Sequence, residues 1–249
     1  MRVFALLLVG LVPQDLPTPE ERADPVGAAR QRIDQRETPG NMARAIDLLE
    51  WRKGQGPESV DVHLLLAEAY YRTVDSLDSS KAEDRRRMTP AREHGLQEAR
   101  DALRLAPDRA DGHYWLGCLL LQTADAEQSY SRLKEAIPEL RRAQRLDPRV
   151  DEGGPARMLG RIYQETPGWP LLGSTTEAIR WYGRSLEAAP DNLQTHLWLG
   201  QTYAADRRVA SARQELEKVV SAQAKPGHEK ETQGLRREAE TLLKTLPAR

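Results

Sequence analysis

The chain has 249 residues, of which 30% are charged and only 5% aromatic, and its formal net charge is −1. A nearly neutral protein gives no electrostatic reason to expect a nucleic-acid partner or an anionic membrane surface. Cys118 is the only cysteine, which excludes an internal disulfide and a metal site built from several thiolates. The abundance of leucine, alanine, arginine and glutamate favours helix over sheet and therefore an all-α fold.

An export signal is the first element predicted along the chain. Arg2 precedes the ten-residue apolar run Val3–Val12, as a positive n-region precedes the h-region of a secretory signal peptide. The run is too short to span a bilayer, and no small-x-small cleavage pattern follows it cleanly. We predict a signal peptide and linker over residues 1–20 and a periplasmic or secreted protein. The alternative is a cytoplasmic protein with a hydrophobic N-terminal helix.

Residues 21–55 are predicted to form a helical pair, at Ala23–Arg36 and Asn41–Gly54, and an internal repeat follows over residues 56–226. Four segments of the repeat carry a leucine followed by a small residue, with tyrosine or leucine three positions later. The Leu-small pairs are Leu66-Ala67, Leu116-Gly117, Leu159-Gly160 and Leu199-Gly200. A small residue lets a neighbouring helix approach closely, while leucine and tyrosine fill the adjoining core.

Second helices with small or apolar residues at i, i+4 and i+7 are predicted at Lys134–Pro148, Thr176–Pro190 and Arg208–Val220. A final helix, His228–Leu246, is expected to cap the exposed apolar end of the stack within residues 227–249. This pattern resembles the tetratricopeptide repeat. The resemblance implies an all-α solenoid of about four helical hairpins.

Three of the four repeats carry insertions between their paired helices. The distance from the small residue of the first helix to that of its partner is twelve positions from Gly200 to Ala212, but eighteen from Gly160 to Ala178. It is nineteen in the second repeat and twenty-eight in the first. Insertions in solenoids collect on one face, often the binding face. The segment PGWPLLGS, which begins at Pro167, is one insertion, and the longest one, in the first repeat, either forms a loop or extends both helices.

One stretch resembles a narrower group. Gly154-Pro155, Arg157, Leu159-Gly160, Pro167–Pro170, Gly173 and Pro190-Asp191 follow the order found in the T component of TRAP transporters and its exported relatives. The resemblance covers about 75 residues and is weak before Asp108; the lipoprotein-type cysteine of some relatives is absent. It implies an extracytoplasmic helical-repeat protein that binds a partner or a solute, and it does not imply catalysis.

Positions three residues before each small residue, and one and four after it, are expected to line a concave groove, because they lie opposite the partner helix. The candidate binding residues chosen from these positions and from the third insertion are Glu68, Tyr71, Tyr114, Arg157, Arg161, Gln164, Trp169 and Gln201.

Two of these candidates have competing structural roles. Arg157 and Arg161 lie one helical turn apart, so their guanidinium groups can converge on a carboxylate. The alternative is that both pair with nearby glutamates as ordinary surface charges. Trp169 lies between two prolines and either covers the groove or anchors its own loop in the core.

His63, His113 and His196 occupy one repeat position, four residues before the small residue. Equivalent positions of a solenoid are separated by a whole helix pair, and helix axes lie about 8–10 Å apart. We therefore do not expect these histidines to share a metal ion, and no metal or other cofactor is predicted.

The sequence contains no glycine-rich phosphate loop and no nucleophile elbow, so an enzyme is not expected. We predict a non-enzymatic scaffold that binds a peptide segment or a partner protein in its groove, with no nucleic-acid partner and no integral membrane span. The alternative function is a carrier for a small apolar or carboxylate ligand within a TRAP-type transport system, with the insertion at Pro167 closing over a cavity.

Overall fold

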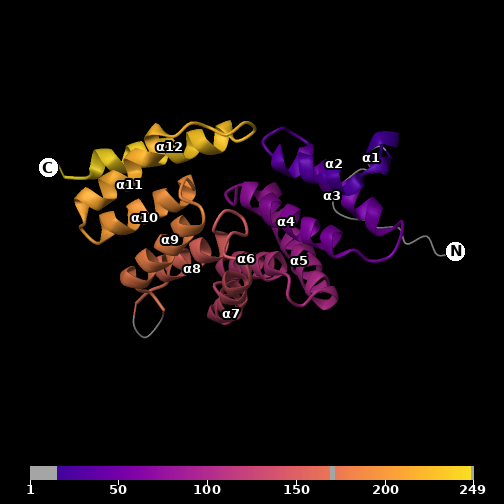
Figure 1. Ribbon diagram of the computed structural model, residues 1–249, viewed down its shortest axis with the longest axis horizontal. Coiled ribbons are helices and arrows are strands. Elements are labelled where there is room, and N and C mark those ends of the chain that lie inside the picture. The colour runs from indigo at the N-terminus through magenta and orange to yellow at the C-terminus, as the bar shows by residue number, and fades with distance from the viewer. Residues whose placement is uncertain (1–15, 169–171, 248–249) are drawn as a thin grey trace. The chain divides into compact units, whose positions relative to one another are not determined.

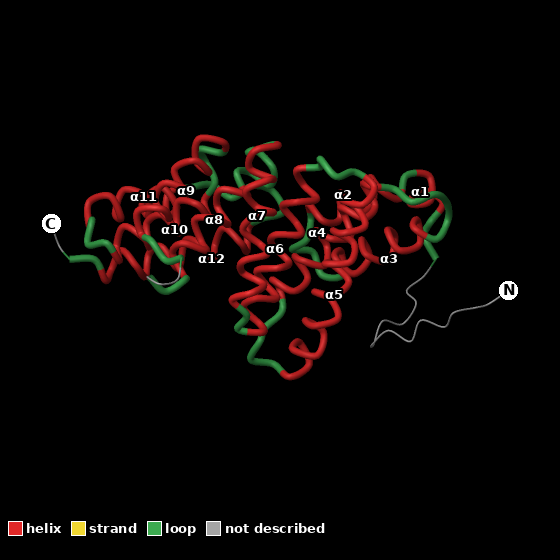
Figure 2. Tube along the Cα trace, turned by 90° about the horizontal axis from the view of Figure 1, so that it is seen from below, coloured by secondary structure: helices red, strands yellow, loops and turns green. Residues whose placement is uncertain are grey.

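The computed structural model describes residues 16–168 and 172–247. This part of the chain forms twelve α-helices and no strand (Figures 1 and 2), which confirms the all-α prediction. The helices divide into two compact units, the first ending at Leu105 and the second beginning at Ala106. None of the described helices is long and apolar enough to cross a membrane. The apolar run at residues 3–12 lies outside the described residues.

The first unit contains five helices. A capping box starts the first of them, because the Thr18 hydroxyl accepts from the Glu21 amide while the Glu21 side chain accepts from the Thr18 amide. The helices are α1 (Pro19–Ala23), α2 (Pro25–Asp34), α3 (Asn41–Lys53), α4 (Val60–Ser76) and α5 (Ala82–Leu105). The pairs α2/α3 and α4/α5 each pack as a hairpin.

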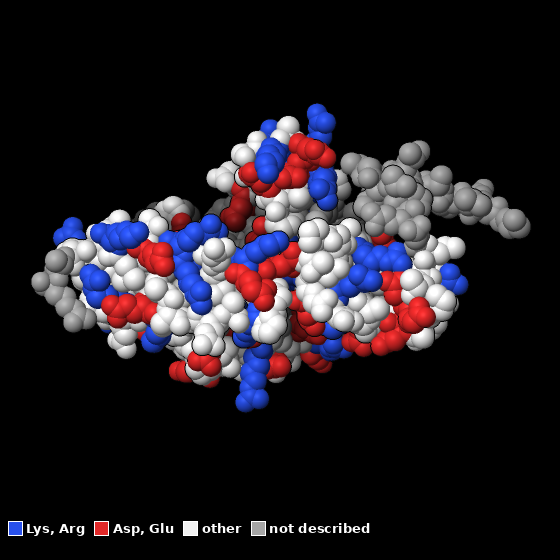
Figure 3. Space-filling model, turned by 90° about the horizontal axis from the view of Figure 1, so that it is seen from above, with Lys and Arg blue, Asp and Glu red and all other residues white. Residues whose placement is uncertain are grey.

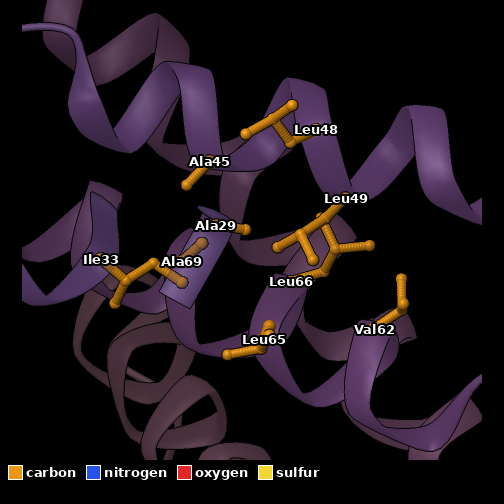
Figure 4. Close-up of a cluster of buried hydrophobic side chains, with 9 residues drawn as sticks. All are labelled: Ala29, Ile33, Ala45, Leu48, Leu49, Val62, Leu65, Leu66 and Ala69. Atoms are coloured by element: carbon orange, nitrogen blue, oxygen red, sulfur yellow. The ribbon is translucent and has the colours of Figure 1, made fainter. Parts of the chain in front are cut away.

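The core of the first unit is built by small and branched side chains from α2, α3 and α4. Figure 4 shows them pointing into one shared interior. The cluster comprises Ala29, Ile33, Ala45, Leu48, Leu49, Val62, Leu65, Leu66 and Ala69, all at most 4% exposed. Alanines from all three helices permit close approach of the backbones, and the leucines fill the remaining space.

The second unit contains three hairpins and a final helix. The hairpins are α6/α7 (Ala110–Glu127 and Tyr130–Leu146), α8/α9 (Gly154–Glu165 and Thr175–Ala188) and α10/α11 (Leu193–Ala205 and Val209–Ser221). The final helix, α12 (Glu229–Thr245), packs on both α10 and α11. Its Ala239 joins Leu197, Leu216 and Val219 in one buried cluster. The predicted C-terminal cap is therefore confirmed.

The glycines of the repeat lie where the second helix presses a large side chain against the first. A Cβ atom added at Gly117 would lie 2.7 Å from Leu140, one at Gly160 would lie 2.6 Å from the Tyr182 ring, and one at Gly200 would lie 2.8 Å from Leu216. Real Cβ atoms do not approach other carbon atoms this closely, so these positions need glycine for packing rather than for backbone freedom.

We expect Gly160→Ala to lower the free energy of unfolding by about 1–3 kcal/mol, because the fully buried Tyr182 ring has to move to make room. Gly183→Ala, on α9, is the matched control, since nothing lies within 4 Å of its added Cβ atom. The control is expected to stabilise the helix by about 0.5–1 kcal/mol. Urea unfolding followed by circular dichroism measures both, and equal effects of the two substitutions would contradict the packing argument.

The three insertions have two different outcomes. In the first repeat the inserted residues extend both helices, so that only Leu77–Lys81 separate α4 from α5. In the second repeat α6 and α7 are lengthened in the same way. The third insertion, rich in proline and glycine, lies between α8 and α9, and its residues 169–171 are outside the described part of the chain. Its neck is closed by the hydrogen bonds of the Gly173 amide to the Pro167 carbonyl, 2.9 Å, and of the Ser174 amide to the Tyr163 carbonyl, 2.9 Å.

Candidate ligand-binding surface

The two candidates in the first unit lie on α4. Glu68 is only 5% exposed, and two arginines meet at its carboxylate: Arg30 on α2 at 2.7 Å and Arg72 on α4 at 2.8 Å. Tyr71, three residues further along the helix, is half-buried. The Glu68 side chain therefore lies between α4 and α2, the first helices of successive hairpins, and its ion pair with Arg30 joins them.

In the second unit Tyr114 is buried in the same manner. Its ring is 1% exposed, and its hydroxyl donates to the Asp151 carboxylate at 2.5 Å. The ring also lies against Gly154, where an added Cβ atom would be 2.6 Å from it. Tyr114 thus fixes the start of α8 against α6 and presents almost no surface to solvent.

Arg157 holds a strained turn in place. Asp151, Glu152 and Gly153 all have left-handed backbones, with φ of 47°, 52° and 79°. The Arg157 guanidinium donates to the Glu152 carbonyl at 3.0 Å, to the Asp151 carbonyl at 3.1 Å and to the Asp151 carboxylate at 2.6 Å. At 8% exposed it lies beneath the surface. Its three bonds stabilise a conformation that residues other than glycine rarely adopt.

Arg161, one turn after Arg157, points in a different direction. It pairs with Glu165 on its own helix, and its guanidinium carbon lies 4.5 Å from the centre of the Trp198 ring on α10. The two arginines therefore do not converge on one ligand. Arg161 pairs with a glutamate, Glu165, as the alternative prediction expected. Arg157 pairs instead with an aspartate, Asp151, which was not among the predicted partners.

Of the two glutamine candidates, Gln164 lies on α8 with Arg161, and Gln201 lies on α10. Gln164 accepts from the Tyr182 hydroxyl at 2.5 Å, and burial raises the pKa of that hydroxyl, so it stays a donor. Gln201 donates to Glu238 of α12 at 2.7 Å. Arg161, Gln164, Trp198 and Gln201 are all half-buried, and we call these four residues the Arg161 surface.

Packing between the first helices of successive hairpins explains which candidates reach solvent. Successive first helices pack on one another as the pairs α2/α4, α6/α8 and α8/α10, and the capping helix α12 packs on α10. The spacing rule selected the side of each first helix that faces the next one. Half-buried residues on this side remain open to a ligand, and fully buried ones hold the first helices together. The binding roles of the candidates stay predictions.

Trp169 lies outside the described residues, so neither of its expected roles is decided. Charged side chains of both signs alternate over the face of the molecule seen in Figure 3, without a broad area of one sign. Among residues 16–168 and 172–247 no three histidine, cysteine, aspartate or glutamate side chains come together as a metal site.

Comparison with known proteins supports the repeat assignment. Residues 172–229 match the family model of the tetratricopeptide repeat. No curated protein matches the chain at a significant level. A thermophilic TPR protein of Thermus thermophilus is similar, at 17% identity and a TM-score of 0.62, with 87% of this chain and 97% of that chain covered.

The crystal structure of MamA is similar as well, at 18% identity and a TM-score of 0.50, with 81% of this chain and 96% of that chain covered. At such identities the likeness shows the fold alone. The chain therefore contains a tetratricopeptide-repeat segment at residues 172–229 and folds as paired helices of the tetratricopeptide type.

Proposed function

We propose that this protein is a non-enzymatic scaffold whose second unit binds a peptide segment of a partner protein on the Arg161 surface. The observation that carries the proposal is the stacking of Arg161 on Trp198, across the neighbouring first helices α8 and α10. Arginine and tryptophan are enriched among the residues that dominate binding energy in protein interfaces. The tetratricopeptide segment at residues 172–229 includes Trp198 and Gln201 and supports the same function.

The chemistry of this surface suits an extended peptide. Trp198 and Glu165 hold the Arg161 guanidinium in one place, so that little conformational entropy is lost when it binds. Its remaining N–H donors, in the plane of the guanidinium, fit a carboxylate or a backbone carbonyl. The side-chain amides of Gln164 and Gln201 combine a donor with an acceptor, as peptide backbone groups require.

The proposal is tested in two steps. A photo-crosslinking residue is placed at Gln201 on the Arg161 surface or, as a control, at the exposed Glu187 on the second helix α9. We expect a partner protein that cross-links from Gln201 and not from Glu187. Binding of the cross-linked peptide segment is then measured by fluorescence anisotropy with the wild type and with two charge-reversal variants.

Arg161→Glu is expected to weaken this binding at least tenfold, since truncated interface hot spots cost about 2 kcal/mol or more. Arg184→Glu is the matched control, because Arg184 stacks on Trp181 at 4.7 Å as Arg161 stacks on Trp198, but from α9. Equal weakening by both variants, or cross-links from both positions alike, would contradict the proposal. A small molecule released on denaturation in native mass spectrometry would favour the carrier function instead.

We further propose that the protein acts outside the cytoplasm as a relative of the TRAP transporter T component. The support is the arginine and apolar run of residues 2–12 and the ordered motif from Gly154 to Asp191. The denatured mass of the protein isolated from its native host tests the first point. Loss of the N-terminal segment would support export, and an intact N-terminus would contradict it.

A further inference from the structure

Three hairpins share a pair of side chains that the sequence pattern did not connect. His63, His113 and His196 each stand four residues before the small residue of the first helix. Their Nδ1 atoms lie 2.6 Å from the carboxylates of Glu98, Glu139 and Glu215, respectively. Each of these glutamates stands three residues after the small residue of the second helix, at Gly95, Ala136 and Ala212. The repeat therefore contains a recurring histidine–glutamate couple.

In the second unit both ring nitrogens of the histidine are engaged. The Nε2 atom of His113 lies 2.9 Å from the Pro107 carbonyl oxygen, and that of His196 lies 2.8 Å from the Pro190 carbonyl oxygen. A carbonyl oxygen only accepts, so Nε2 carries a proton in both rings. The neutral imidazole then has a bare lone pair on Nδ1, which would face a carboxylate oxygen at 2.6 Å.

Two acceptors cannot remain at that distance without a proton between them. Each couple therefore holds a second proton, shared between Nδ1 and the carboxylate. The His113 and His196 rings are 7% and 5% exposed, so a water molecule does not readily enter to supply the proton between Nδ1 and the carboxylate. The charge-assisted hydrogen bond joins the first helix to the second, and the Nε2 bond joins the first helix to the turn before it.

The two couples differ in the charged groups beside them. Glu215 also accepts from Lys218 on its own helix at 3.0 Å, and although burial raises its pKa, His196 and Lys218 together lower that pKa below the usual range. The helices α8, α9 and α12 also pack on α10. Among their described residues and the turns that follow them, only the Pro190 carbonyl after α9 is hydrogen-bonded to the His196 ring. His113 faces Glu139, and Arg142 on the same helix α7 pairs with Asp108 in the turn before α6.

The remaining hairpin of the second unit, α8/α9, folds without a histidine–glutamate couple. At the histidine position α8 has Ala156, and at the glutamate position α9 has Trp181. Both residues are buried, at 0% and 6% exposed. A single large apolar side chain thus takes the place of a protonated pair, and the hairpin keeps the same packing. A buried ion pair is often no more stabilising than a hydrophobic replacement, so its presence calls for another explanation.

The couple of the first unit is built differently. Glu98 there also accepts from Lys53 at 2.7 Å, and the Nε2 atom of His63 is buried without a hydrogen-bond partner among the described residues. A neutral His63 with its proton on Nδ1 satisfies this geometry. Among the described residues, only the two couples of the second unit therefore have hydrogen bonds at both ring nitrogens.

We propose that the His113–Glu139 and His196–Glu215 couples are proton-binding latches, which hold the α6/α7 and α10/α11 hairpins closed at acidic to neutral pH and loosen them as the pH rises. An unfolded imidazole releases its proton near pH 6.5. The stabilisation weakens below about pH 4.3, where an unfolded glutamate takes up a proton. It is complete just below about pH 6.5 and is lost as the pH rises above that value. Over that interval each couple changes the unfolding equilibrium constant by up to tenfold per pH unit.

The protonation state is tested directly on the whole chain by nitrogen-15 spectroscopy of the five histidines. At pH 7.5 we expect His113 and His196 to carry protons on both ring nitrogens, because each ring faces an acceptor on both sides. Bare Nδ1 atoms in His113 and His196 at that pH would overturn the proposal. This measurement needs no substitution and does not depend on the proposed partner binding.

The link to stability is tested with the replacement that the chain itself supplies. The variant His196→Ala with Glu215→Trp copies the α8/α9 hairpin, and urea unfolding is compared with the wild type between pH 6 and pH 8.5. We expect the wild type to become less stable as the pH rises over this range. In the double variant the unfolding equilibrium constant should depend less on pH, by up to a factor of ten per pH unit. His228→Gln is the control and should keep the wild-type slope. Identical slopes for the wild type and the double variant would overturn the proposal.

Discussion

Arg157→Ala is expected to lower the free energy of unfolding of the second unit by about 3–5 kcal/mol, because removal of one partner from a buried ion pair leaves the other charge uncompensated. The Asp151 carboxylate would lose its guanidinium partner and retain the bond from the Tyr114 hydroxyl. The left-handed backbones of Asp151 and Glu152 would also lose their guanidinium bonds. Urea unfolding measures the loss, and hydrogen exchange locates it at the start of α8.

Arg161→Ala is the matched control, one turn further along the same helix. It removes a pair four residues apart on a helix and a cation–π contact, and such partly exposed interactions contribute no more than about 1 kcal/mol each. Equal losses for the two arginine variants would show that the turn does not depend on Arg157.

Glu21→Gln is expected to destabilise the first unit by about 2–3 kcal/mol, since it removes the charge at which three helices meet. The Glu21 carboxylate on α1 accepts from Arg44 of α3 at 2.5 Å and from Arg32 of α2 at 2.8 Å. Its side chain is only 9% exposed. Hydrogen exchange of α1–α3 in the whole chain measures the effect, and exchange in the second unit is the internal reference.

The same carboxylate makes the first unit sensitive to acid. Arg44, followed by the Thr18 amide and Arg32, outweighs the effect of burial and holds the pKa of Glu21 at about 2. Because this folded pKa lies below the unfolded value near 4.3, the stabilisation is present above about pH 4.3 and is lost as the pH falls towards 2. Glu21→Gln should remove this part of the acid dependence. Glu20→Gln, at an exposed position, should leave the acid dependence close to that of the wild type, and a similar response from both variants would contradict this role for Glu21.

The sequence by itself determined the helices, their pairing and the close contacts within each hairpin. The leucine-small pairs and the turn prolines recur along the chain, and helical periodicity translates them directly into which face is buried. Gly117, Gly160 and Gly200 pack against Leu140, Tyr182 and Leu216, as the need for close approach predicted. The apolar face of the last helix likewise identified it as the cap.

Only the tertiary structure decided which side chains of the first helices meet solvent and which partners they take. The spacing rule treated Arg157 and Arg161 alike, because periodicity gives the side of a helix and not what covers that side. Arg157 is buried because the turn before α8 folds back over it. The left-handed backbone of this turn is more common for aspartate than for most residues, but glutamate, as at Glu152, rarely adopts it, so the local sequence does not predict it. The histidine–glutamate couples also escaped the sequence, since they join residues 19–35 positions apart whose contact depends on how two helices align in space.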